Sequence, residues 1–267
     1  MNPEHVTLIY FSPTATTRIV LEGVAQGMGL EIRDSIDITR PEIREDQAPH
    51  FSDQLVIIGA PVYGGRLPKD AADYYSRMTA SGTPAVLVVL YGNREFEDAL
   101  LELKDISADQ GFVPIAGAAF IGEHSFCSDE FQIARSRPDE KDMNAAREFG
   151  QQVIQWLRGR DLKKRPDLSV PGNFPYKEVA SRGVIPFLDV TEDCVECGVC
   201  AAACPKSCID ETDHFATIDE LCIHCCACVK VCPEQARVLK DGPIKDIARW
   251  LSEHFETRKE PQTFMAE

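Results

Sequence analysis

Eight cysteines arranged in two identical patterns constrain this chain more than any other feature of its sequence. The segments "CVECGVCAAACP" (194–205) and "CIHCCACVKVCP" (222–233) each read C-x₂-C-x₂-C-x₃-C-P. Their cysteines pair at a constant offset of 28 residues, which marks an internal duplication. Ten of the eleven cysteines lie between positions 194 and 232, and such a concentration in a cytosolic protein indicates metal binding.

The spacing also distinguishes between metals. Zinc can use two C-x₂-C pairs, but it does not need three close cysteines and a fourth that precedes proline. An iron–sulfur cube with four iron atoms needs four thiolates, and a C-x₂-C-x₂-C loop supplies three of them. The fourth thiolate must then come from elsewhere in the chain.

Residues 187–240 resemble a bacterial-type ferredoxin with two [4Fe–4S] clusters. In that family the fourth cysteine of each run binds the cluster of the other run. The resemblance therefore implies one cluster on Cys194, Cys197, Cys200 and Cys232, and a second on Cys204, Cys222, Cys225 and Cys228. Of the two cysteines left over in this segment, Cys208 is expected to pack, and Cys226 either packs or donates to a cluster sulfur.

The first half of the chain alternates between strand-like and helix-like segments. Continuous apolar runs separated by helical patterns predict a parallel sheet covered on both faces, in a doubly wound α/β domain. Strands are expected at 5–11, 30–38, 54–62, 84–91 and 112–122, with helices at 14–29, 68–80, 95–110 and 138–160. In such domains ligands bind beyond the carboxyl ends of the strands.

The segment "FSPTATTR" (11–18) follows the first strand at this edge. The start of a helix offers unpaired N–H groups to an anion, and the hydroxyls of Ser12, Thr14, Thr16 and Thr17 add further donors. The lysine of a nucleoside triphosphate loop is absent, and so are the glycines of a dinucleotide fold. Helix capping would need only one of the hydroxyls. The cluster therefore favours a terminal phosphate dianion.

These residues resemble the phosphate loop of flavodoxins, roughly [TS]-x-T-G-x-T, with Ala15 in place of the glycine. The resemblance covers about residues 5–158 and implies a five-stranded sheet of order 2-1-3-4-5 that binds FMN. In flavodoxins two further loops, here 59–68 and 91–96, enclose the flavin ring. The implied FMN contacts are Ser12, Thr14, Ala15, Thr16, Thr17, Pro61, Val62, Tyr63, Gly64, Gly65, Tyr91, Gly92, Asn93 and Arg94.

Three of these loop residues have alternative interpretations. Tyr63 and Tyr91 either stack on the flavin ring or anchor their loops to the core. Many flavodoxins carry an acidic residue where "YGNRE" has none, and Arg94 lies nearby. It either stabilises a reduced, anionic flavin or is an ordinary surface residue. His124 and Cys127, in the loop after the fifth strand, are expected to be structural.

The formal net charge of −15 argues against nucleic-acid binding and suits a redox partner protein with a basic docking face. The basic, proline-rich stretch at 158–178 indicates a linker between two acidic domains. No apolar run reaches membrane-spanning length, and "MNPEHVTLIYF" lacks the basic flank of a signal peptide, so we expect a cytoplasmic protein.

The two halves together resemble the flavodoxin–ferredoxin fusion proteins of anaerobes. The expected domains are 1–158 (flavodoxin-like), 159–186 (linker), 187–240 (ferredoxin-type) and 241–267 (C-terminal helix and tail). The favoured function is single-electron transfer between the two clusters, FMN and external redox proteins. The alternative is an FMN-dependent reductase of a quinone or nitro compound, fed by the ferredoxin domain. The absence of a nicotinamide-binding fingerprint argues against direct oxidation of NAD(P)H.

Overall fold

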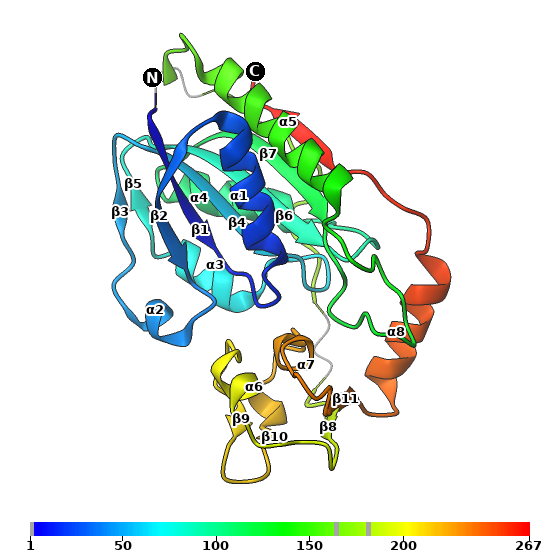
Figure 1. The fold of residues 1–267 in the computed structure, drawn as a ribbon. Helices are drawn as coiled ribbons and strands as arrows, with labels where there is room; N and C mark the ends of the chain where they lie inside the picture. The colour runs from blue at the N-terminus through cyan, green and yellow to red at the C-terminus, as the bar shows by residue number, and fades with distance from the viewer. Residues whose placement is uncertain (1–2, 163–165, 180–182) are drawn as a thin grey trace.

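A central sheet of six strands, five from the first half of the chain and one from its C-terminal tail, organises an α/β domain (Figure 1). The computed structural model describes residues 3–162, 166–179 and 183–267. The sheet order is β12-β7-β6-β4-β1-β2, and every pairing is parallel except that of β12 with β7. The strands are β1 (His5–Tyr10), β2 (Glu31–Asp37), β4 (Leu55–Pro61), β6 (Pro84–Tyr91), β7 (Val113–Ile121) and β12 (Gln262–Met265).

Helices cover both faces of this sheet, because the central strands are apolar on both sides. On one face α1 (Thr16–Met28) and α5 (Glu140–Leu157) pack against a buried cluster that includes Val20 and Phe149. On the other face α3 (Lys69–Tyr75) and α4 (Ala99–Asp109) pack against a cluster that includes Tyr75 and Leu103. The short elements α2 (Pro41–Glu45), β3 (His50–Phe51) and β5 (Thr79–Ala80) complete this α/β domain.

The predicted mixed α/β fold with a mostly parallel sheet is confirmed, and its five parallel strands have the predicted order. The predicted number of strands is wrong, because the C-terminal tail adds β12 at the edge beside β7. Trp156 Nε1 donates to the Ala266 carbonyl (2.8 Å), and this bond holds the end of the tail against α5. No helix in the described ranges has the length and apolarity needed to cross a bilayer.

The duplication seen in the cysteine spacing is repeated in the backbone of the cysteine-rich domain. Left-handed residues recur at the same offset of 28, as in Gly198 (φ 77°) with Cys226 (φ 55°) and Ser207 (φ 47°) with Gln235 (φ 53°). Gly198 and Cys226 each precede a short helix. The elements are β8 (Leu188–Val190), α6 (Val199–Ala202), β9 (Ile209–Asp210), β10 (Ala216–Thr217), the 3₁₀ helix η2 (Asp219–Leu221), α7 (Ala227–Lys230) and β11 (Arg237–Leu239).

A third hydrophobic cluster joins the two domains. It combines Phe126 and Phe131, from the loop between β7 and α5, with Phe187 and with Leu251 of α8 (Pro243–His254). The centroids of the Phe126 and Phe187 rings are 6.5 Å apart. Trp250 of α8 is 46% exposed, so the apolar face that this helix buries is centred on Ile244, Ala248 and Leu251. The cysteine-rich domain is therefore packed onto the α/β domain.

Residues 166–179, which fall within the predicted linker, lie on the α/β domain. Leu168 is buried in the cluster beneath α3 and α4. Asp98 accepts hydrogen bonds from the backbone N–H groups of Asn173 (2.8 Å) and Lys177 (2.6 Å). The Lys177 ammonium pairs with Glu97 (2.6 Å), so its positive charge is neutralised within the α/β domain.

Candidate cofactor sites

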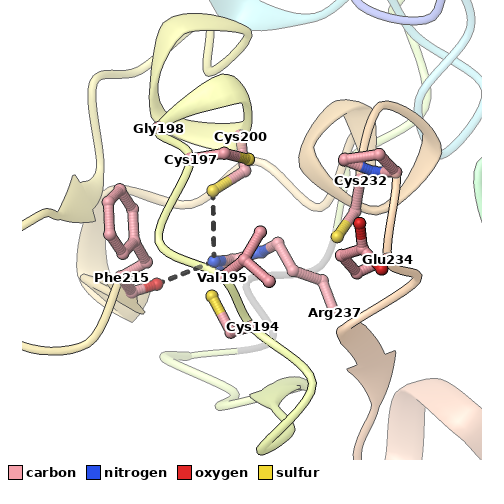
Figure 2. A pocket seen from close by; sticks show the side chains of 10 residues that line it. Cys194, Val195, Cys197, Gly198, Cys200, Phe215, Cys232, Glu234 and Arg237 are labelled. Carbon is pink, nitrogen blue, oxygen red and sulfur yellow. Dashed lines mark hydrogen bonds between the residues drawn. The ribbon is translucent and has the colours of Figure 1, made fainter.

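Four cysteines from the two runs line one cavity of the cysteine-rich domain. Figure 2 shows Cys194, Cys197 and Cys200 coming from one stretch of chain and Cys232 reaching the cavity from the facing segment. Cys197 is exposed and Cys200 is buried. We call these four residues the first cysteine set.

A second cavity is lined by Cys204, Cys222, Cys225 and Cys228, which we call the second cysteine set. Cys208 and Cys226 also line it. The Cys204 and Cys208 sulfur atoms are 3.4 Å apart, and a hydrogen bond from the Cys208 thiol lowers the pKa of Cys204 to about 6. Burial raises the pKa of Cys225 to about 12. The second set is thus the more enclosed of the two.

Backbone donors reach the fourth cysteine of each run in the same way. The N–H of Cys208 donates to Cys204 Sγ (3.4 Å), and the N–H of Ala236 donates to Cys232 Sγ (3.2 Å). These two pairs occupy equivalent positions in the repeats. A donor aimed at sulfur favours the thiolate form, which is the form that binds metals.

The structure thus brings together the two crossed sets that the sequence predicts. Within the described ranges, no three His, Cys, Asp or Glu side chains converge closely enough to hold a metal ion. A [4Fe–4S] cluster takes four separate thiolates around a multi-atom core, and each cavity is lined by four cysteines. The donor type, number and grouping fit two such clusters, and the clusters themselves stay a prediction.

The phosphate-loop residues lie between β1 and α1, at the carboxyl end of the sheet. Ala15 adopts the left-handed conformation (φ 64°) that a glycine there would adopt more readily. Ser12 is fixed on both sides, because its N–H donates to Thr39 Oγ1 (2.6 Å) and its Oγ accepts from the Arg18 N–H (3.1 Å). Thr39 is a contact that the sequence pattern does not reveal.

Hydroxyl groups remain available in this loop. The Thr14 and Thr16 hydroxyls are 3.5 Å apart. Thr17 is 1% exposed and its Oγ1 has no hydrogen-bond partner among the described residues. A buried hydroxyl without a partner costs free energy unless a ligand meets it. Together with the N-terminus of the 13-residue helix α1, these groups fit a phosphate.

Tyr63 lies at the boundary with the cysteine-rich domain. Paired backbone hydrogen bonds between Tyr63 and Arg66 (2.9 and 3.3 Å) close its loop. Burial raises the pKa of Tyr63 well above its usual value, and the nearby Cys225 and Cys226 raise it further. Tyr63 therefore lies within electrostatic range of the second cysteine set.

The backbone of the neighbouring residues in this loop lies close to Leu90 and Glu97. Pro61 ends β4, and the Val62 N–H donates to the Leu90 carbonyl (2.7 Å). Gly64 and Gly65 are left-handed, with φ of 65° and 89°. The φ of 89° favours glycine at position 65, and a Cβ there would also displace the Glu97 carboxylate.

The structure places Tyr91 in the core, where it anchors its loop. The residue is 3% exposed, and its ring centroid is 5.6 Å from that of Phe96. Asn93, which is 2% exposed, donates from Nδ2 to the carbonyls of Phe255 (2.6 Å) and Thr257 (2.9 Å). Arg94 pairs with Glu97 (2.9 Å). This loop is therefore clamped to the C-terminal tail, and its contacts with FMN stay a prediction.

His124 covers Gly92, since a Cβ on this glycine would lie 2.2 Å from the imidazole Cδ2. The His124 Nδ1 accepts a hydrogen bond from the Phe126 N–H (3.0 Å). Burial lowers the pKa of His124 to about 4, and the charges of Lys230 and Arg94 act in the same direction. The imidazole is therefore neutral near pH 7.

Known proteins match this chain in structure and not in sequence. No protein-family model and no curated protein sequence matches the chain. Similar solved structures include a flavodoxin from Archaea (10% identity, 57% of this chain and 97% of that chain, TM-score 0.36). A rubredoxin oxygen:oxidoreductase from Desulfovibrio gigas shares 14% identity over 59% of this chain and 37% of its own, with a TM-score of 0.41. An NADH:FMN oxidoreductase in its apo form shares 12% sequence identity with this chain. The match covers 61% of this chain and 94% of that protein, with a TM-score of 0.43.

The similar structures are thus flavodoxin-like and flavodiiron proteins, and the chain spans about a third of the flavodiiron relatives it matches. No likeness to a ferredoxin is among those described above. The assignment of the cysteine-rich domain therefore depends on its own residues and their positions.

Proposed function

We propose that this protein transfers electrons between two [4Fe–4S] clusters, FMN and external redox proteins. When bound, the clusters exchange single electrons and the flavin accepts one or two. The observation that carries the proposal is the packing of the cysteine-rich domain onto the α/β domain through one hydrophobic cluster, with Tyr63 of a proposed flavin loop within electrostatic range of Cys225. A contact of this kind is what two redox centres in one chain need in order to exchange electrons.

The chain's own residues would hold the groups as follows. The two cysteine sets would each ligate one cluster. The hydroxyls of Thr14, Thr16 and Thr17 and the first N–H groups of α1 would bind the FMN phosphate. The loops at 61–65 and 91–94 would contact the ring.

The positions of the two sets suggest an order for electron transfer. Besides Tyr63, Ile223 beside the second set packs against the core of the α/β domain. The Phe187 and His224 rings, 4.5 Å apart, lie in the same region. The first set includes the exposed Cys197 instead. External proteins would therefore exchange electrons at the first set, and the second set would connect it to the flavin loops.

Carboxylates surround the proposed outer position. Glu196 and Glu234 are exposed next to cysteines of the first set, within a chain of formal net charge −15. Such a surface would attract a partner with a basic docking face, and dissolved salt would weaken that attraction. His124, the titratable ring beside Gly92, is neutral near pH 7 and is a poor proton donor to a substrate. These features favour the carrier over the reductase.

The test uses full-length protein purified without oxygen. Iron, sulfide and released flavin should correspond to two [4Fe–4S] clusters and one FMN per chain. Turnover of quinones, nitroaromatics and candidate redox proteins is then measured across a salt series. Fast, salt-sensitive exchange with a protein and slow reduction of small oxidants are expected. Rapid, saturable and salt-insensitive reduction of one small molecule would favour the reductase, and bound zinc would contradict the cluster assignment.

A further inference from the structure

Arg237 is a buried cation at the wall of the first cysteine set (Figure 2). It is the first residue of β11 and is 3% exposed. Its Nη1 donates to the Phe215 carbonyl (2.7 Å) and lies 3.8 Å from Cys200 Sγ, and its Nη2 donates to Thr217 Oγ1 (2.6 Å). The guanidinium is therefore held in place by neutral groups and directed at a cysteine sulfur.

The charge of Arg237 has no carboxylate partner among the described residues, and its buried Nε has no hydrogen-bond partner. Arg137 is the other buried arginine of the described chain. Its charge is neutralised in the usual way, by an ion pair with the buried Asp142. Burying an uncompensated cation costs several kcal/mol. Inside the cavity the cysteine sulfurs, as thiolates, would supply the negative charge that offsets Arg237, with the exposed Glu234 also at the cavity wall.

The duplication shows that this charge is peculiar to one repeat. At the offset of 28, the position equivalent to Arg237 is Ile209, which is buried and apolar. Arg237 lines the first cavity, whereas Ile209 lines the second. The guanidinium also acts on Cys228 of the second set, where it opposes the burial that raises the pKa of this thiol to about 11. The guanidinium thus bonds to one cysteine of each set, but of the two cavities it lines that of the first set.

We infer that Arg237 makes the two clusters unequal, by raising the reduction potential of a cluster on the first set above that of a cluster on the second. Reduction adds a negative charge, and a nearby cation and a hydrogen bond to sulfur both stabilise the reduced form. The effect is strong in a buried site of low effective dielectric constant. An electron would then rest at the outer position, where protein partners dock. This inference depends on the proposed clusters.

The test measures both potentials in the full-length holoprotein, by a redox titration followed with EPR. The paramagnetically shifted β-proton NMR signals of the ligating cysteines assign each potential to its cluster. Arg237→Ile introduces the residue that the chain itself carries at the equivalent position. We expect at least a tenfold loss of electron affinity at the first-set cluster, which is about 59 mV for a one-electron couple, and a smaller shift at the second. Arg237→Lys should retain most of the potential.

Lys240→Gln is the matched control, because it removes a cation of the same segment that is 38% exposed and paired with Asp189. This variant should leave both potentials in place. Unchanged potentials in the Arg237→Ile protein, or equal shifts at both clusters, would overturn the inference and leave the proposed function intact. Loss of cluster assembly in both Arg237→Ile and Arg237→Gln would show that Arg237 is needed for folding, and would also overturn it. Wild-type protein that takes up no iron and sulfide would instead contradict the proposed function.

Discussion

Lys206 Nζ lies 2.7 Å from Asp70 Oδ1, and this ion pair joins the loop after the first cysteine run to helix α3 of the α/β domain. The Arg44 guanidinium, 4.0 Å from the same carboxylate, donates to the Pro205 carbonyl. On the other side of the interface Lys230 pairs with Glu123 (2.5 Å) and donates to the Cys127 carbonyl (2.7 Å). The two domains therefore dock through specific ion pairs, although both carry many carboxylates.

Weakening this dock should slow electron exchange between the domains. In the Lys206→Gln, Lys230→Gln double variant, the rate of flavin reduction after rapid reduction of the clusters is expected to fall severalfold. High salt should slow the wild type toward the same rate, because salt screens half-exposed pairs. Stopped-flow absorbance follows both steps. Lys69→Gln serves as the control, since its pair with Asp73 lies within α3. An effect of similar size in this control would argue against the docking role.

Crossed ligation predicts which cluster each cysteine supports. Cys232→Ala should remove the cluster whose other ligands belong to the first run, although Cys232 lies in the second run. Cys204→Ala should remove the cluster whose other ligands belong to the second run, although Cys204 lies in the first run. Iron content and the EPR spectra of the reduced proteins would show which cluster survives. If Cys232→Ala abolished the cluster built on Cys222, Cys225 and Cys228 instead, each run would bind its own cluster.

The hydroxyl groups of the phosphate loop should contribute directly to FMN affinity. Replacing Thr14 and Thr16 together by valine is expected to weaken FMN binding by about 1–3 kcal/mol, the usual cost of an unpaired buried polar group. Fluorescence quenching of FMN by the apoprotein measures this. Chromatography of the released cofactor should show FMN, and a release of FAD would count against the phosphate site.

Thr17 allows a sharper version of the same experiment, because its hydroxyl is buried and unpaired. Thr17→Val should leave the apoprotein equally stable or more stable, since it removes an unsatisfied donor, and should still weaken FMN binding. Opposite signs for the two measurements would indicate a binding role. A loss of stability in the apoprotein with unchanged affinity would indicate a structural one.

The pair of Arg137 and Asp142 should be critical for the stability of the α/β domain. Arg137 Nε lies 2.9 Å from Asp142 Oδ2, and the two side chains are 5% and 0% exposed. Asp142→Asn would leave a buried guanidinium without its counter-charge, at a cost of about 3 kcal/mol in the free energy of unfolding. Urea denaturation of the apoprotein measures this. Asp129→Asn removes the exposed partner of Arg135 and should leave the stability within error.

His124 predicts how the stability of the apoprotein changes with pH. Its pKa is about 4 in the folded chain and 6.5 ordinarily, so the unfolded chain binds the proton more tightly. The stabilisation is complete above pH 6.5 and is lost as the pH falls toward 4, with a slope of up to about 1.4 kcal/mol per pH unit. His124→Gln should reduce this slope and leave a constant difference above pH 7. An identical slope in the variant would contradict the assignment.

The parts of the structure that follow strong local patterns could be predicted from the sequence. Strands β4 and β6 are long, β-branched and fully apolar, and they lie at the centre of the sheet as expected. The repeated spacing identifies the cysteine-rich segment, and the resemblance to ferredoxins implies the two crossed cysteine sets, each of which lines one cavity. Strand β12 could not be predicted, because "QTFM" is four residues long and its place depends on a distant edge of β7.

Other features depend on contacts that no local pattern encodes. Tyr91 ends one buried strand and Tyr63 follows another, but Tyr91 packs into the core whereas Tyr63 lies within electrostatic range of Cys225. Asn93 binds carbonyls more than 160 residues away. Arg237 did carry a signal, since an alignment of the two repeats sets it against Ile209. A charged residue aligned with an apolar one in the other repeat indicates that the two cysteine sets have different electrostatic surroundings.

The return of the chain to the sheet in β12 means that the cysteine-rich domain is inserted within the α/β domain and not appended to it. A gene fragment that stops after α5 would omit a strand of the sheet and leave the edge of β7 open to pairing with another chain. A fragment of the α/β domain that keeps β12 needs a connection from the end of α5 back along the whole helix, because Arg258 pairs with Asp139 at the start of α5 and Trp156 near its end contacts Ala266. The chain therefore leaves α5 at one end and, after the cysteine-rich domain, returns to the α/β domain at the other end of this helix.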